Sequence, residues 1–319
     1  MGRPAAAGRG VENNQRRLIG GVWSQPGSIS GQSGAIFTAL LVLPHAFSDL
    51  TTMLASVTAA AVGSHYLVNF LIIFLRYALF AGVAYLVFWV WRRARWQPRR
   101  IQPRFPARQH LHTEIKYSLL SCLIFAAVGA GIFLAKQQGY TLMYNDVARY
   151  GWGYLVLSIL VAIVAHDAYF YWTHRFMHLP AVFRHVHRVH HLSHNPSPWA
   201  AFSFHPLEAV IEAGIVPLLA FVLPMHPLAL GVFMLYQMGM NVLGHLGYEP
   251  YPARFLQTRF GRLHNTSTHH NMHHQHVGHN FGLYFNWWDR LMGTNHPQYQ
   301  ERFEQAAGGK KAQPKPQAA

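Results

Sequence analysis

The sequence contains almost no cysteine and little acid. Cys122 is the only cysteine, so a single chain can form neither a disulfide framework nor a thiolate metal site. Asp and Glu number 11 against 26 Lys and Arg, and charged residues make up 12% of the chain. That fraction is about half of the ~25% found in an ordinary soluble domain. With 51% hydrophobic residues, the composition argues against a soluble protein.

The excess of basic charge also needs an explanation. A formal net charge of +15 would suit nucleic-acid binding if the basic residues followed one polar face. They fall instead in short runs beside long apolar stretches, which is typical of membrane proteins with basic cytosolic loops. We therefore expect no nucleic-acid partner.

Long apolar stretches predict an all-α fold, a multi-span membrane helical bundle. A stretch of about 20 apolar residues crosses the ~30 Å hydrocarbon layer as a helix. Three stretches meet this criterion clearly: Tyr66–Trp91, Ile115–Ala135 and Trp152–Trp172. Residues 35–63 are a doubtful span, because Pro44, His45 and Asp49 interrupt them. A pair of shorter stretches predicts a helical hairpin that dips into the bilayer and returns: Ala209–Leu223 and Pro227–His245.

Arginine predicts the orientation of the helices. The loop from Arg92 to Arg108 carries seven arginines, whereas the loop from Lys136 to Gly151 has only Lys136 and Arg149 as basic residues. The positive-inside rule places the first loop in the cytosol, and everything after His166 then lies on that same side. Residues 1–33, which are basic, and 301–319 show no apolar periodicity and are predicted to be disordered tails.

Histidine is the abundant residue. Of the 23 histidines, eighteen lie between His166 and His279. They include three boxes: His174 and His178; His187, His190 and His191; His270, His273 and His274. Residues three and four apart share one face of a helix, so we expect the histidines of each box to point the same way. One such pair occurs often by chance, but three boxes on one membrane face predict a metal site.

The number and kind of metal follow only in part from the residues. Eight box histidines exceed the coordination shell of one ion, so two metal ions fit better. No His-Glu-x-x-His motif occurs, which disfavours a zinc metalloprotease. Between residues 168 and 288 the only acids are Glu208, Glu212 and Glu249, and none begins the Glu-x-x-His motif of ferritin-like di-iron sites. The site would therefore be all imidazole, which suits Fe, Cu, Zn and Ni alike.

The boxes and their flanking residues resemble the sterol desaturase and fatty acid hydroxylase superfamily. The resemblance covers about residues 150 to 295, nearly half of the chain. Beyond the boxes it rests on the run from His166 to His178, on Phe204 to Glu208, on His245 with Gly247, and on Asn280 to Gly282 leading to Trp288 to Thr294. Within the superfamily the sequence is most similar to the sterol C5-desaturase branch. Asn271 and Met272 depart from the family, which more often has an acidic or hydroxyl residue there.

The resemblance implies a lipid oxidoreductase with a pair of metal ions, taken to be iron. It would hydroxylate or desaturate a C–H bond of a sterol or fatty-acyl lipid, using O2 and electrons from a b-type cytochrome or from a ferredoxin with its reductase. The implied metal ligands are His174, His178, His187, His190, His191, His245, His270, His273 and His274. Further candidates, as ligands or as supports of ligands, are His166, Asp167, His205, Glu208 and His269. The implied organisation is transmembrane helices over residues 34–150 and a catalytic domain over 151–300.

Other readings remain open at this stage. A membrane metal transporter also carries histidine and acid, but it places them within its spans, whereas the boxes here follow the helix ends. The same chemistry could act on an alkyl-ether lipid, an ornithine lipid or a carotenoid. Since the C-terminal sequence shows no retrieval signal, a bacterial inner membrane is favoured over the endoplasmic reticulum.

Overall fold

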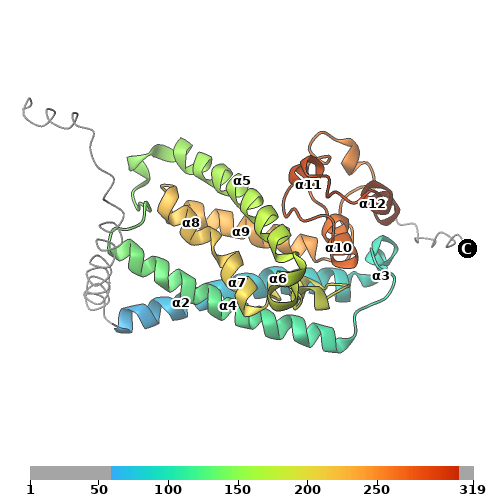
Figure 1. The fold of residues 1–319 in the computed structure, drawn as a ribbon, viewed down its shortest axis with the longest axis horizontal. Coiled ribbons are helices and arrows are strands. Elements are labelled where there is room, and N and C mark those ends of the chain that lie inside the picture. Colours follow the sequence, from blue (N-terminus) through green and yellow to red (C-terminus); the bar gives the residue numbers. More distant parts are fainter. Residues whose placement is uncertain (1–58, 309–319) are drawn as a thin grey trace, which may run out of the picture. The chain divides into compact units, whose positions relative to one another are not determined.

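The computed structural model describes residues 59–308, which belong to one compact unit (Figure 1). The described residues form helices and no named strands; two isolated bridges pair Arg100 with Tyr248 and His264 with Phe285. The predicted all-α class is confirmed. The predicted tail of residues 1–33, and residues 35–58 of the doubtful span, lie outside the described residues.

Among residues 59–308, four helices are long and apolar enough to cross a membrane. The first is α2 (Ala59–Ala84), which continues as the π-helix η1 (Tyr85–Trp91). The others are α4 (Arg108–Gln137), α5 (Gly151–Met177) and α9 (Pro227–Gly244). The three predicted spans each lie inside one of the first three helices. The chain is therefore a membrane protein, and the part that the structure describes contains four candidate spans.

Small residues bring the helices α2 and α4 together, side by side in Figure 1. Ala81 of α2 and Ala126 of α4 are fully buried, and close backbone approach over small residues is the usual basis of helix packing in membranes. A Cβ atom at Gly129 would lie 3.2 Å from the side-chain amide of Asn69. The larger Tyr77 then packs into the same core as Ala81.

The predicted hairpin is present but asymmetric. Its first limb is divided into α7 (Pro206–Ala213) and α8 (Ile215–Val222), and its second limb is the full span α9. With 8 residues, α8 is only about 12 Å long, less than half of the ~30 Å hydrocarbon layer. Between α7 and α8, Gly214 leaves room for α5, because a Cβ atom there would lie 2.4 Å from the hydroxyl of Tyr169.

The remaining elements are short. They are α3 (Arg93–Trp96), η2 (Gln97–Arg99), η3 (Val147–Arg149), α6 (Pro180–Val186), η4 (His190–Leu192), η5 (Pro198–Phe202), η6 (Phe255–Gln257), α10 (Ser267–His276), α11 (Trp287–Leu291) and α12 (Tyr299–Ala307). Of these, α3, α10, α11 and α12 gather at one end of the long helices (Figure 1).

The arginine-rich loop lies at this same end. The Gln102 side-chain amide donates to the carbonyl of His194 at 2.7 Å and to Oδ1 of Asn271 at 2.9 Å. The backbone N–H of Glu249 donates to the carbonyl of Arg99 at 3.0 Å. The loop that carries seven arginines and the histidine-rich segments are therefore on one side of the bundle.

The prediction of a disordered tail from residue 301 is wrong for residues 301–307. They continue the helix α12, in which Tyr299 and Phe303 are buried against Met272. This short amphipathic helix gains its stability from packing on α10 rather than from its own length, so its sequence alone gives a weak signal. Residues 309–319 lie outside the described part of the chain.

Candidate metal centre

Nine histidines form two adjacent groups, each able to hold a metal ion. The five-histidine cluster consists of His174, His178, His187, His191 and His273. The four-histidine cluster consists of His190, His245, His270 and His274. Within each cluster the candidate ligand atoms lie within 4.8 Å of one another. These nine residues are the set that the resemblance implied as metal ligands.

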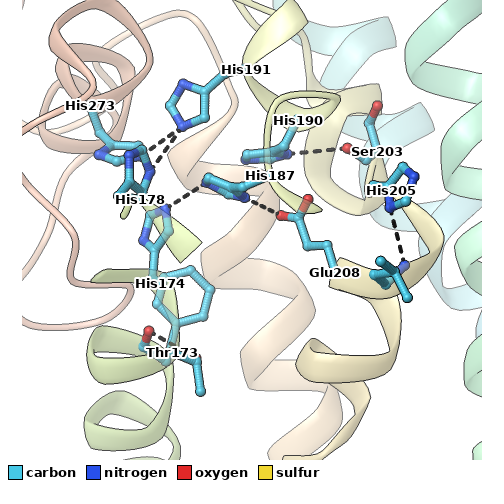
Figure 2. Close-up of polar contacts among 12 residues, drawn as sticks. Thr173, His174, His178, His187, His190, His191, Ser203, His205, Glu208 and His273 are labelled. Carbon is cyan, nitrogen blue, oxygen red and sulfur yellow. Dashed lines mark hydrogen bonds and ion pairs between the residues drawn. The ribbon is translucent and has the colours of Figure 1, made fainter. Parts of the chain in front are cut away.

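Ring nitrogens converge in the five-histidine cluster. The Nε2 atoms of His174 and His187 are 3.1 Å apart, those of His178 and His191 3.2 Å, and those of His191 and His273 3.1 Å. Neighbouring ligands that each bind one metal at about 2.0–2.1 Å are separated from one another by roughly 2.9–3.4 Å. The spacing therefore suits donors arranged around a shared ion (Figure 2).

The four-histidine cluster contains a triangle of Nε2 atoms. His245 is 3.1 Å from His270 and 3.3 Å from His274, and His270 and His274 are 3.3 Å apart. Three mutual hydrogen bonds cannot form this triangle, because each nitrogen has only one direction in which to donate or accept. Nε2 of His190 also lies 3.3 Å from Nε2 of His245.

Backbone carbonyls fix which nitrogen faces each cluster. In four of the histidines Nδ1 donates to a backbone carbonyl. The pairs are His174 with Phe281 (2.8 Å), His190 with Ser203 (3.3 Å), His245 with Asn241 (2.8 Å) and His273 with His279 (2.7 Å). A carbonyl only accepts, so in these four neutral rings Nε2 carries a bare lone pair. Metal-binding histidines are typically oriented in this way by a partner of the other ring nitrogen.

The orientation of the Nε2 lone pairs fits a bound metal ion. The Nε2 lone pairs of His190 and His245 face each other at 3.3 Å with no proton available to join them. Two facing lone pairs repel each other unless a cation lies between them. The all-imidazole donor set is one that Fe, Cu, Zn or Ni accepts, so the residues fit a transition metal.

Burial keeps the rings neutral, as ligands must be. Eight of the nine are buried and His178 is partly buried. Burial, together with the neighbouring rings, lowers the pKa of His178 to about 2 and that of His245 to about 4. The same causes hold the pKa well below its usual range in six others: His187, His190, His191, His270, His273 and His274.

The local chain geometry differs from the predicted geometry in two boxes. The second box is not on one helical face: His187 is the C-cap residue that follows α6, and His190 and His191 lie in the 3-10 turn η4. His190 therefore enters one cluster while His187 and His191 enter the other. This contradicts the expectation that the histidines of each box point one way.

The third box divides for a geometric reason. It lies on the helix α10, where successive residues are about 100° apart. His270 and His274 are thus about 40° apart on the helix surface, whereas His273 lies about 100° from His274. The first pair enters the four-histidine cluster and His273 the five-histidine cluster, so one helix joins both.

The two candidate carboxylates have different roles. Glu208 accepts from Nδ1 of His187 at 2.6 Å, and both side chains are buried (Figure 2). Asp167 does not touch any of the nine histidines. Its Oδ1 accepts from the backbone N–H groups of Tyr284 and Phe285 at 3.0 and 3.1 Å. Of the two, only Glu208 therefore supports a candidate ligand directly.

Three further candidates are absent from both clusters. Nδ1 of His166 is 2.7 Å from the hydroxyl of Tyr284. His205 caps α7, where its Nδ1 accepts from the backbone N–H of Leu207 at 3.3 Å. Nε2 of His269 is 3.6 Å from Asp289. Their positions next to the boxes in sequence do not bring them to the metal sites.

Sequence reasoning missed the loop that carries two of the orienting carbonyls. The carbonyls of His279 and Phe281 flank Asn280, which has a positive φ of 61°. The carboxylate of Asp289 accepts from the backbone N–H groups of Phe281 and Gly282, both at 2.8 Å. Asp289 lies in the Trp288 to Thr294 stretch that resembles the family, and that position is a signal from which its role could have been predicted.

Glu249 is the second missed residue, and it caps α10. Its Oε2 accepts from the backbone N–H of Thr268 at 3.0 Å and from the Thr268 hydroxyl at 2.7 Å. A carboxylate at a helix N-terminus compensates the unpaired N–H groups and the helix dipole. Glu249 thus fixes the start of the helix that joins the two clusters. Nothing in its sequence surroundings signalled this role.

Comparison with known proteins agrees with the histidine pattern. The sequence profile of the family described as "Fatty acid hydroxylase" matches residues 159–294. A Delta(7)-sterol 5(6)-desaturase of Gibberella zeae is 31% identical over 62% of this chain, and a lathosterol oxidase of Rattus norvegicus is 30% identical over 61%. The alignments cover 60% and 64% of those two relatives. A Delta(7)-sterol 5(6)-desaturase of Aspergillus fumigatus is 30% identical to this chain, and the alignment covers 62% of this chain and 67% of that relative. No solved structure matches this chain.

Proposed function

This chain belongs to the fatty acid hydroxylase family, and from that premise we propose that it is a membrane-bound oxidoreductase that hydroxylates or desaturates a C–H bond of a sterol or fatty-acyl lipid. The observation that carries the proposal is the pair of adjacent all-histidine clusters. The relatives named as sterol desaturases and lathosterol oxidase support the reaction class. The proposed role is a step in lipid biosynthesis.

The proposed cofactor is a pair of iron ions, one in each cluster. Bound iron would supply the activation of O2 that oxidation of an unactivated C–H bond requires. The chain's own contribution is positioning and exclusion of water. Backbone carbonyls and Glu208 hold the imidazoles in place, and burial keeps them neutral. No side chain outside the nine histidines is proposed as an acid or base.

The site is proposed to face the cytosol. The support is the packing of the arginine-rich loop against the histidine region, through Gln102 with His194 and Asn271, because arginine-rich loops remain on the cytosolic side. Electrons would come from a b-type cytochrome or a ferredoxin with its reductase. Whether the membrane is a bacterial inner membrane stays a prediction.

The test is oxidation of lipid by the purified protein, supplied with O2 and a chemical or protein reductant. Lathosterol and palmitoyl lipids are offered separately, and products are measured by mass spectrometry. We expect product that depends on O2 and that falls at least a hundredfold in His245→Ala. His226→Ala is the matched control, because His226 caps α9 at the opposite end from His245. Equal turnover in both variants would contradict the proposal.

A further inference from the structure

A cavity of about 800 Å³ lies between α2, α4, α5 and the hairpin α7–α9. Its volume is within the ~300–1,000 Å³ of typical ligand pockets. The walls are mainly apolar and include Ile72, Val128, Ile132, Leu230 and Met234. None of the nine candidate metal ligands lines it. The cavity is therefore distinct from the histidine clusters.

One end of the cavity approaches the metal centre. Phe202 and Phe204 line the cavity there, and the ring centroid of Phe204 is 5.2 Å from that of His190. The other end is lined by His65, Lys136 and Asn145. His65 lies near the start of α2 and Lys136 near the end of α4, and these are the ends of the two spans away from the arginine-rich loop. A slender lipid could thus lie along the spans with one end a single aromatic ring from the four-histidine cluster.

Arg76 is a charge without a counter-ion in this cavity. It lies in the α2 span, next to Tyr77, whose ring stacks on Phe202. Its Nε is buried without a hydrogen-bond partner. The two salt bridges among residues 59–308 join other side chains. An unpaired charge within a membrane span is costly and commonly marks a ligand site, and a guanidinium matches carboxylate or phosphate geometry.

The other ionisable groups of the cavity are arranged differently. Lys136 already donates to Oδ1 of Asn145 at 2.6 Å, at an exposed position, so an anion there would compete with water. Glu212 lines the cavity and is not ion-paired with Arg76. An ionised Glu212 would repel an anion, so its removal must not weaken anion binding if Arg76 is the receptor.

We propose that the cavity binds a lipid anion, whose single carboxylate or phosphate group pairs with Arg76 and whose apolar body extends toward Lys136. This deepens the proposed function and rests on it, because it names the substrate class of the same site. It also orients the substrate, since the charged group lies near Phe202. The oxidised C–H bond is then close to the charged group and not at the remote end of the chain.

The experiment measures equilibrium binding of tritiated probes to the full-length chain in detergent. Palmitate and hexadecyl phosphate are the anionic probes, and they distinguish the two head groups. Methyl palmitate is the uncharged match, and cholesterol is the neutral sterol. We expect one site per chain for at least one anion, bound at least tenfold more tightly than methyl palmitate, a ratio of about 1.4 kcal/mol.

Variants assign the charge. Arg76→Gln should weaken anion binding at least tenfold, and Arg76→Lys should restore part of it. Lys136→Gln is the matched control in the same cavity and should change binding less than twofold, and Glu212→Gln should not weaken binding. Thermal unfolding of each variant checks that it is folded, and the comparison of palmitate with its methyl ester needs no variant.

Three results would overturn the proposal. They are equal affinity for palmitate and methyl palmitate, saturable binding of cholesterol alone, and loss of anion binding in Lys136→Gln but not in Arg76→Gln. Binding needs neither metal nor turnover. Anion binding at Arg76 in a protein that oxidises no lipid would therefore refute the proposed function and the substrate role of the anion, and would leave only the anion-binding site standing.

Discussion

Glu208 and Asp167 offer a direct test of how the candidate ligands are held, because both are buried carboxylates and only one touches a ligand. Glu208 accepts from His187 at 2.6 Å. Asp167 accepts from two backbone N–H groups instead. Loss of a carboxylate that supports a metal ligand typically lowers metal affinity 10–100-fold, which is about 1.4 to 2.7 kcal/mol.

The effect of Glu208→Ala should be confined to one metal. His187 belongs to the five-histidine cluster, so that ion should be lost first while the ion of the four-histidine cluster remains. In a titration of metal-free protein against a chelator of known affinity, the wild type should show two tight sites. Glu208→Ala should show one tight site and one weakened by roughly 10–100-fold.

Asp167→Ala is the matched control. It leaves two backbone N–H groups without a partner, each costing about 1–3 kcal/mol, so its thermal midpoint should fall while both metal affinities stay within about threefold. A protein in which Asp167→Ala weakens one metal as much as Glu208→Ala would refute the reasoning. So would a Glu208→Ala variant with two unchanged sites.

Three other perturbations have definite expected outcomes. Asp289→Ala removes the acceptor of the Phe281 and Gly282 N–H groups and should lower the free energy of unfolding by about 2–6 kcal/mol, measured by denaturant unfolding; wild-type stability would contradict this. Gly214→Ala places a Cβ atom 2.4 Å from the Tyr169 hydroxyl and should lower the free energy of unfolding by about 1–3 kcal/mol. Gly153→Ala, with nothing within 4 Å of its Cβ in the helix α5, should not destabilise the protein in the same denaturant assay, and equal losses in the two variants would contradict this. Burial depresses the pKa of both His264 and His245 to about 4. Below the ordinary histidine pKa of about 6.5, these two side chains therefore bind more protons in the unfolded chain than in the folded one. The stability of the metal-free protein should be complete above about pH 6.5 and should fall as the pH drops toward 4; stability that rises in this window would contradict it.

The sequence predicted the spans and the gathering of nine histidines, for physical reasons. Apolar length identifies a membrane helix without knowledge of its neighbours, as for Tyr66–Trp91, which lies inside the observed span. The histidines are detectable because so many occur so close together. Neither signal depends on tertiary structure.

What the sequence did not reveal depends on backbone placement. The carbonyls of Phe281 and His279 orient His174 and His273, and a carbonyl has no residue type that could indicate its role. The division of His270 and His273 between two clusters depends on where α10 sits relative to the bundle. Asp167 precedes a box in sequence yet supports a distant loop, because a helix carries adjacent residues in different directions.

Metal content tests the central claim most directly. Elemental analysis by plasma mass spectrometry is performed on the purified, detergent-solubilised protein beside a His190→Ala, His273→Ala double variant, which removes one ligand from each cluster. We predict about two irons per chain in the wild type, two being the number of clusters, and loss of most of that iron in the variant. No bound metal, or a metal content unchanged by the two substitutions, would contradict the account.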